Sequence, residues 1–258
     1  MKIPITKPLF DERVVITLDV DWAPDFVIDA VAQILAERRV RATWFVTHRS
    51  AAVERLSGYG DLFELGIHPN FLARSTHGET PDAVLRHCLE LVPGATSMRT
   101  HSLVQSTPLL AQVLRDTPIT TDVSLFLPRT PFLRPHEFWW RGRALVRIPF
   151  FWEDDCEMQR GDPCWRLAQL LRVGEGLKVF DFHPLHVYLN SARPDEYALL
   201  KSRVGKLSET TPADVADIQH EGEGTKTLFL ETVEHLASAG TSLRIRDVSE
   251  RWRNGDAA

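Results

Sequence analysis

The chain has 258 residues, a formal net charge of -5, and apolar and charged fractions of 43% and 25%, as in ordinary soluble globular proteins. The acidic balance argues against a nucleic-acid partner, and no apolar run reaches the length of a transmembrane span. The first eight residues lack the apolar core of a signal peptide, and the three cysteines form no paired motif. We therefore expect a protein of the reducing cytoplasm.

Strand-like and helix-like segments alternate along the chain. Hydrophobic periodicity predicts strands at 14–21, 42–47, 62–68, 96–101, 119–123, 138–140, 145–152 and 176–183. Helices are predicted at 24–39, 81–91, 108–115, 165–171 and 228–239. The polar, glycine-containing segment 208–225 is typical of a mobile loop. This alternation favours one domain over residues 1–258, built as an α/β barrel with parallel strands.

The first predicted strand ends in two carboxylates, Asp19 and Asp21. In a continuing strand both would point to one face, at the carboxyl edge where α/β proteins place their active sites. Two carboxylates so close need a positive partner. A metal ion that binds one and leaves the other as a base meets that need. The alternative is that Asp21 only caps the helix predicted at 24–39.

Three other strand ends also carry titratable side chains, and the first of them offers a metal ligand. His68 follows the third predicted strand, and His77 lies nine residues later. On one continuous helix their rings would face apart, so they can share a metal only if residues 69–78 fold back. Asp21, His68 and His77 would suit Zn²⁺ with open positions for water and substrate. Alternatively, His68 is a hydrogen-bonded, half-buried histidine.

The remaining strand ends offer catalytic groups. Arg99 could hold Asp19 ionised, or form an ordinary ion pair at the barrel rim. His183 could protonate a leaving amine, with His186 as a rival three residues away. Trp152 could form the wall of a sugar-binding cleft, although a strand tryptophan is more often part of the core. The residues predicted to bind substrate are His101, Trp152, Asp155 and His186.

Together these motifs resemble the polysaccharide deacetylase family, the NodB-homology carbohydrate esterases. Thr17–Asp21 is similar to the family's aspartate motif, with one residue inserted between the carboxylates, and Glu64–His68 is similar to its histidine motif. The family's second histidine lies four residues later, where this chain has Leu72, so its role is carried over to His77. Segments 68–71, 99–106 and 180–184 are similar to the branch linked to O-antigen biosynthesis, the WbmS-type proteins. The resemblance covers roughly residues 14–188.

The resemblance implies a distorted (β/α) barrel, often of seven strands, and metal-dependent removal of an N-acetyl group from an amino sugar. The metal, most simply zinc, would lie on Asp21, His68 and His77. Asp19 would act as the base, kept ionised by Arg99, and His183 as the acid. The expected substrate is a nucleotide-linked or lipid-linked sugar. Two alternatives stay open: hydrolysis of an N-formyl or cyclic amide, and an inactive sugar-binding protein, as the absent histidine at Leu72 would allow.

Overall fold

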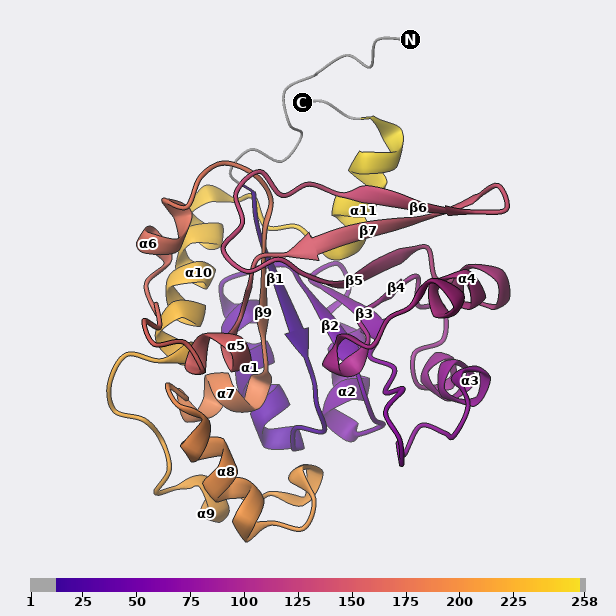
Figure 1. Ribbon diagram of the computed structural model, residues 1–258. Helices are drawn as coiled ribbons and strands as arrows, with labels where there is room; N and C mark the ends of the chain where they lie inside the picture. Colours follow the sequence, from indigo (N-terminus) through magenta and orange to yellow (C-terminus); the bar gives the residue numbers. More distant parts are fainter. Residues whose placement is uncertain (1–12, 256–258) are drawn as a thin grey trace.

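The protein, seen here as a computed structural model that describes residues 13–255, is built on one nine-stranded sheet (Figure 1). The strands are β1 (Val14–Asp19), β2 (Ala42–Val46), β3 (Phe63–Ile67), β4 (Ser97–Met98), β5 (Thr121–Phe126), β6 (His136–Trp140), β7 (Arg143–Phe150), β8 (Trp152–Glu153) and β9 (Lys178–Phe182). Their order is β6-β7-β5-β4-β3-β2-β1-β9-β8. All neighbours run parallel except β6 and β7, which form an antiparallel hairpin.

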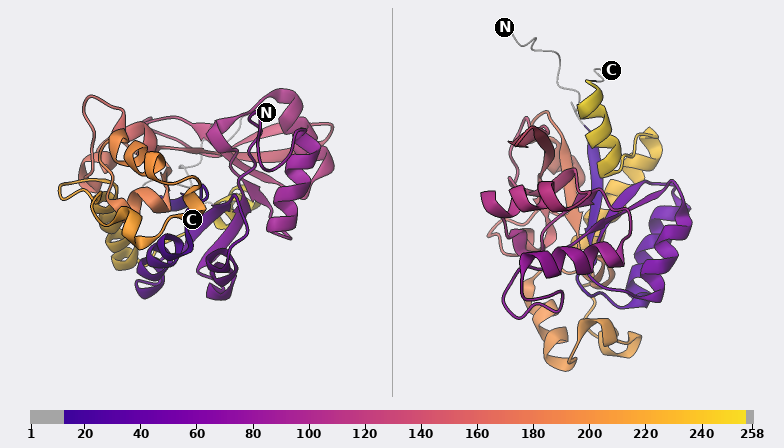
Figure 2. Two further views of the ribbon diagram at one scale, coloured as in Figure 1. Left: turned by 90° about the horizontal axis from the view of Figure 1, so that it is seen from below. Right: turned by 90° about the vertical axis from the view of Figure 1, so that its right-hand side faces the viewer.

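Helices cover the sheet on several sides (Figures 1 and 2). They are α1 (Asp25–Glu37), α2 (Ala51–Leu56), α3 (Pro81–Leu91), α4 (Thr107–Asp116), α5 (Asp154–Met158), α6 (Leu167–Leu171), α7 (Pro184–Leu189), α8 (Pro194–Arg203), α9 (Pro212–Val215), α10 (Thr225–Ala239) and α11 (Ile245–Asn254). In Figure 1, α8 and α9 lie beyond the carboxyl ends of the central strands, and α11 lies at the opposite end. No helix among residues 13–255 is long and apolar enough to cross a membrane.

The sheet curls, although its strand order is open. Only Phe151 separates β7 from β8, and its N–H donates to the Val179 carbonyl of β9 at 2.8 Å. Val146, Val179 and other strand residues therefore share one buried cluster, together with Ile245 of α11. The α/β class is confirmed, but the open order of nine strands does not confirm the expected closed barrel of seven.

Local sequence explains most of the elements. The fully buried, β-branched run of β1 favours a strand between two parallel neighbours. Helix α3 begins after Thr80, whose hydroxyl accepts the N–H of Ala83, with Pro81 in the first turn. In β3, a Cβ on Gly66 would lie 2.7 Å from Ser97 Oγ and 2.8 Å from the Phe45 ring, so only glycine fits.

Several predicted bounds needed correction. The strand predicted at 96–101 is reduced to β4, because the chain leaves the sheet before Arg99 to form the site. The segment 208–225 is not wholly irregular, since it includes α9, and Asn190 Nδ2 donates to the carbonyls of His220 and Gly222. The sequence does not predict the short helices α2, α5, α7 and α9 or the ten-residue helices α8 and α11. The mobility of the segment stays a prediction.

Candidate active site

The two N-terminal carboxylates come together through a turn and not through strand alternation. Strand β1 ends at Asp19, and Asp21 and Trp22 adopt positive φ angles of 42° and 56°. The Ala23 N–H closes this turn on the Val20 carbonyl at 2.8 Å. Left-handed backbone at non-glycine residues is uncommon and often marks functional sites. Pro24 takes the cap position of α1, so Asp21 is not the helix cap.

Asp21 forms a candidate metal site together with two histidines. Its Oδ1 lies 3.1 Å from His68 Nε2 and 3.2 Å from His101 Nδ1, and these two nitrogens are 3.4 Å apart. Burial would raise the pKa of Asp21, but the imidazoles of His101 and His68 hold that pKa well below its usual range. The group therefore combines one ionised oxygen and two nitrogens, all within 4.8 Å of one another.

The tautomer of His68 suits a metal ligand. Its Nδ1 lies 2.7 Å from the Arg99 carbonyl oxygen, which can only accept a hydrogen bond, so Nδ1 carries the proton. The Nε2 lone pair then faces Asp21. A backbone carbonyl that fixes the far nitrogen of a histidine is the usual support of a metal-binding imidazole. His68 is 2% exposed, so its ring has little freedom to leave this orientation.

The structure does not bring His77 into this group. Its Nε2 lies 2.8 Å from the Thr47 carbonyl, and its Nδ1 accepts the N–H of Asn70 at 3.1 Å. Both ring nitrogens are thus engaged with the backbone, which leaves no lone pair for a metal. Trp22 lies between the two regions, with ring centroids 5.5 Å from His77 and 5.3 Å from His101. The residues 69–78 do fold back, but they carry His77 to the far side of Trp22.

Asp19 is held by a buried arginine. Arg99 is fully buried, and its Nη1 donates to Asp19 Oδ1 at 2.8 Å and also to Asp181. Its Nη2 donates to Thr17 Oγ1 at 2.8 Å. The second oxygen of Asp19 lies 3.4 Å from His68 Nε2, at the edge of the candidate metal group. Arg99 therefore orients one oxygen of Asp19 and leaves the other facing the site, as a base requires.

Asp181 was not predicted as a site residue. Burial raises its pKa well above the usual range, with a further contribution from Asp19, although Arg99 acts in the opposite direction. Its Oδ2 has no hydrogen-bond partner among the described residues. The sequence could have indicated Asp181, because it lies in β9 two residues before the predicted acid His183.

His183 lies across the site from Asp19, with its Nε2 3.6 Å from Asp21 Oδ2. Asp154 contacts it twice, through the backbone N–H at 2.7 Å and through Nδ1 at 2.6 Å. Burial alone would lower the pKa of His183, but the carboxylates of Asp154 and Asp155 raise that pKa well above 6.5. His183 is therefore a stabilised imidazolium whose Nε2 faces the site. Asp154 was given no role, although it lies two residues after the strand predicted at 145–152.

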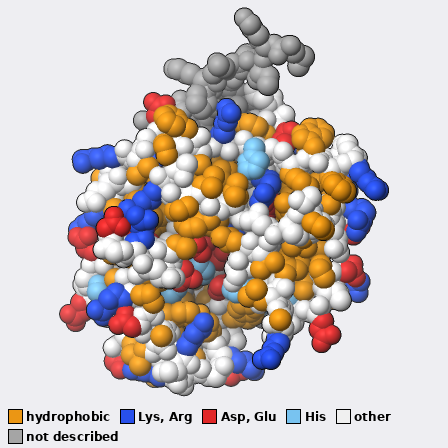
Figure 3. Space-filling model, viewed as in Figure 1, with side chains coloured by type: hydrophobic (Ala, Val, Ile, Leu, Met, Phe, Trp, Pro, Cys, Tyr) orange, Lys and Arg blue, Asp and Glu red, His pale blue; other side chains and the backbone are white. Residues whose placement is uncertain are grey.

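The residues predicted to bind substrate occupy different environments. His101 is in the metal group. Asp155 is 44% exposed at its side chain, and its Oδ1 lies 3.0 Å from His186 Nε2, near His183. Trp152 is 1% exposed and packs on Phe180 and Phe182, so its ring belongs to the core and does not face a cleft. On the face shown in Figure 3, acidic and histidine side chains gather in a hollow near the centre.

These groups fit a divalent cation well. Asp21, His68 and His101 supply an N₂O donor set, which suits Zn²⁺ with positions left for substrate. Two carboxylates, Asp21 and Asp19, lie around the same point, and a cation there offsets their mutual repulsion. A candidate metal site with a restrained carboxylate on one side and a histidine held by a carboxylate on the other is typical of metal-dependent hydrolases.

The comparisons identify the family. The WbmS-like polysaccharide deacetylase family matches residues 16–201, so the chain belongs to that family. A crystal structure of a polysaccharide deacetylase involved in O-antigen biosynthesis from Bordetella bronchiseptica is 31% identical, with a TM-score of 0.75 over 88% of this chain and 91% of that one. The peptidoglycan deacetylase PdaC from Bacillus subtilis is 11% identical, with a TM-score of 0.46 over 98% and 96% of the two chains. No curated protein matches the chain.

Family membership makes the protein a hydrolase that acts on the amide bond of N-acetyl sugars. The resemblance seen in the sequence motifs is thereby confirmed.

Proposed function

We propose that this protein is a zinc-dependent N-deacetylase of the cytoplasm, acting on an amino sugar in a precursor of O-antigen or a related surface glycan. One observation carries the proposal, the position of the Asp21, His68 and His101 group between two restrained side chains. On one side lies Asp19, which is held by Arg99. On the other side lies His183, which is held by Asp154. Base and acid thus flank a single point where an acetamido group could be held.

The metal ligands in this proposal are Asp21, His68 and His101. His101 replaces His77, because the backbone contacts of His77 leave it no free nitrogen. When bound, the divalent cation supplies Lewis acidity to the amide carbonyl of the substrate.

Asp19 takes a proton from the attacking water through Oδ2. Its Oδ1 is occupied by Arg99 at 2.8 Å, so the carboxylate cannot rotate away from the site. The guanidinium also places a positive charge against the buried Asp19 carboxylate, which offsets part of the cost of burying it. Arg99 is therefore a positioning residue, and it acts through Asp19.

His183 donates a proton from Nε2 to the nitrogen of the departing sugar amine. Asp154 holds Nδ1 at 2.6 Å and stabilises the imidazolium before the reaction, so a proton is available at neutral pH. His186, the rival acid, has its Nε2 3.0 Å from Asp155 and its Nδ1 3.1 Å from Ser191 Oγ. Both of its nitrogens are engaged, which favours His183 as the acid.

The substrate class rests on the relative from Bordetella bronchiseptica, which is described as involved in O-antigen biosynthesis. We propose that this chain acts on the corresponding kind of precursor, an N-acetylated sugar on a nucleotide or lipid carrier. The products are acetate and the free amino sugar.

The test measures the acid released by zinc-loaded protein from N-acetyl and N-formyl amino sugars. Acetate release that ceases with a chelator and returns with Zn²⁺ supports the proposal. Faster formate release favours the alternative amide substrate. Sugar binding without release of either acid, at full metal occupancy, favours a sugar-binding protein and contradicts the proposal.

A further inference from the structure

The β6–β7 hairpin leaves large aromatic side chains uncovered at one edge of the sheet. In Figure 1 it extends to the right-hand margin of the molecule, and β6 is the last strand on that side. Trp139 is 62% exposed and Trp140 is 37% exposed, whereas the core tryptophans Trp44 and Trp152 are almost fully buried. Large exposed aromatic side chains that adjoin one another commonly mark an interaction surface.

The turn between the two strands is tight and regular. Arg141 and Gly142 both have positive φ angles, of 48° and 80°, as in the two-residue turns that join antiparallel strands. The strand register continues to this turn, with Trp140 paired to Arg143 and Trp139 next in the ladder. The backbone therefore holds the aromatic and cationic side chains of the tip in fixed positions before a partner arrives.

The two tryptophans point to opposite faces of the hairpin, because successive residues of a strand alternate between its faces. Trp139 shares one face with Glu137, to whose Oε2 its Nε1 donates at 2.9 Å. Trp140 lies on the other face, with Phe138. A single flat protein surface could contact only one of these faces. The interfacial layer of a lipid bilayer surrounds an inserted tip and can receive both indoles at once.

The hairpin is basic although the chain as a whole is acidic. Residues 136–147 include three arginines and one glutamate, while the net charge of the chain is -5. Arg141 makes no ion pair with any residue in the range 13–255, and Arg143 donates only to the Arg115 carbonyl, at 3.5 Å. Unpaired guanidinium groups beside tryptophans are complementary to a surface of anionic phosphate headgroups.

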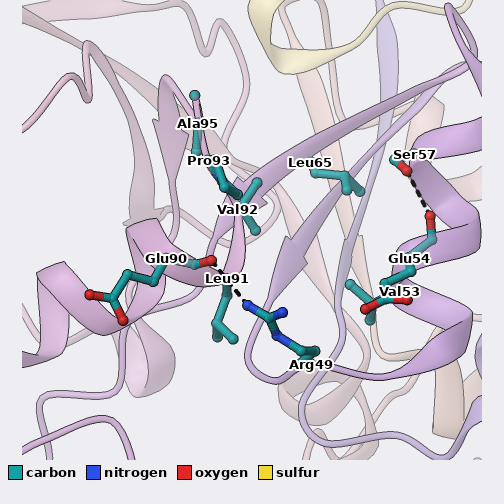
Figure 4. A pocket seen from close by; sticks show the side chains of 11 residues that line it. Arg49, Val53, Glu54, Ser57, Leu65, Glu90, Leu91, Val92, Pro93 and Ala95 are labelled. Atoms are coloured by element: carbon teal, nitrogen blue, oxygen red, sulfur yellow. Dashed lines mark hydrogen bonds between the residues drawn. The ribbon is translucent and has the colours of Figure 1, made fainter.

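Other arginines on the surface lie beside acidic residues. Figure 4 shows Arg49 in a hollow of about 390 Å³ between α2 and the end of α3, where its Nη2 donates to the Glu90 carbonyl at 3.4 Å. Glu54 also lines that hollow, and Arg55 of α2 pairs with Asp29. The two arginines at the hairpin tip pair with no carboxylate of the described residues, so they remain available to an external anion.

We propose that the β6–β7 hairpin docks on a membrane surface of anionic lipids, with Trp139 and Trp140 in the interfacial layer and Arg141 and Arg143 against phosphate headgroups. This docking goes beyond the proposed deacetylation and does not depend on it. It has a consequence for the substrate that does rest on the proposed function. A deacetylase held at a bilayer is placed to act on a lipid-linked sugar in preference to a soluble nucleotide sugar.

The test measures how the full chain sediments with vesicles of phosphatidylcholine and phosphatidylglycerol in equal amounts, and with vesicles of phosphatidylcholine alone. We expect binding to the anionic vesicles that weakens as salt is added, and little binding to the neutral ones. Replacing Trp139 and Trp140 together with alanine should weaken the binding about tenfold. Arg141→Ala should weaken it about fivefold, because an arginine near an anionic membrane contributes about 1 kcal/mol.

Two substitutions serve as matched controls. Phe132→Ala removes an aromatic side chain that is 66% exposed and precedes β6, at the end of the strand opposite the turn. Arg39→Ala removes an exposed arginine that, like Arg141, has a positive φ angle and no ion pair among the described residues. Both control variants should bind anionic vesicles as the unchanged protein does. Circular dichroism of every variant should match the native protein, since all the replaced side chains lie outside the core.

The outcomes separate this proposal from the deacetylase function. If the unchanged protein does not bind anionic vesicles, or if the folded double tryptophan variant binds them equally well, the docking proposal is wrong. A dimer in analytical ultracentrifugation that the same variant dissociates, with no vesicle binding, would assign the hairpin to contact between two copies and would also overturn it. Acetate release from a soluble N-acetyl amino sugar should be the same in every variant. Its complete absence contradicts the deacetylase proposal and leaves the vesicle result to decide on the hairpin.

Discussion

Replacing Asp154 with asparagine tests the acid most directly. Asp154 lies 2.6 Å from His183 Nδ1, and the amide of asparagine can still accept that hydrogen bond while the negative charge is lost. Two unit charges about 4 Å apart attract by about 4 kcal/mol at an effective dielectric constant of about 20. The lost attraction should lower the pKa of His183, although Asp155 stays and continues to raise it.

Because His183 is the proposed acid, a change in its pKa changes the pH at which turnover declines. The reaction needs His183 protonated, so turnover falls as the pH rises through the pKa of His183. In Asp154→Asn that pKa is lower, and the alkaline decline should begin at a correspondingly lower pH. Above the new pKa, kcat should fall about 10²–10⁴-fold, the usual contribution of a general acid.

The assay is a pH profile of acetate release, with metal content measured on the same samples. Asp155→Asn is the matched control: it removes a charge one residue away that pairs with His186, so its alkaline limb should move less. An alkaline limb that stays in place in Asp154→Asn, with metal retained, would refute the reasoning. It would show that the limb reports a group other than His183.

Three further predictions concern the ligands, the base and the core. His101→Ala should lose zinc in equilibrium dialysis, whereas His77→Ala should keep it, because His77 bonds only to groups outside the metal cluster; zinc loss in His77→Ala alone would contradict the ligand set. Asp19→Asn should keep zinc in the same dialysis and release acetate about 10²–10⁴-fold more slowly, so a nearly normal rate would exclude Asp19 as the base. Ile245→Ala should reduce the free energy of unfolding in urea by about 2–5 kcal/mol. Glu250→Ala on the exposed face of α11 should change it by less than about 0.5 kcal/mol, and equal effects would mean that α11 is not packed as described.

The sequence predicts strands and helices well where the pattern lies within a few neighbouring residues. The run of β1, the proline and threonine at the start of α3, and the placement of titratable residues after strands are all short-range patterns, and each corresponds to an observed element. The catalytic assignments of Asp19, Arg99 and His183 stay predictions, but the structure places all three around one point.

What the sequence could not predict depends on how loops fold back. Spacing allowed His77 to reach the metal group if residues 69–78 reversed direction. They do reverse, but the position of Trp22 sends His77 to another pocket. His101 was predicted to bind substrate and was only the next candidate for the second nitrogen ligand, in a strand expected to continue to that residue. Strand β4 ends at Met98, and the backbone that follows turns His101 toward Asp21. Such outcomes depend on tertiary packing, which a periodicity does not encode.

The position of α11 has a consequence for how the chain matures during synthesis. Ile245 and Val248 fill the same buried cluster as Val15 of β1, and the Ile245 N–H donates to Thr43 Oγ1 at 2.9 Å. These partners are separated by some two hundred positions along the chain. While residues 245–254 are still within the ribosome, the apolar interior behind β1 and β2 stays open to water. The strands that carry Asp19 and His68 can therefore reach their final rigidity only after α11 emerges.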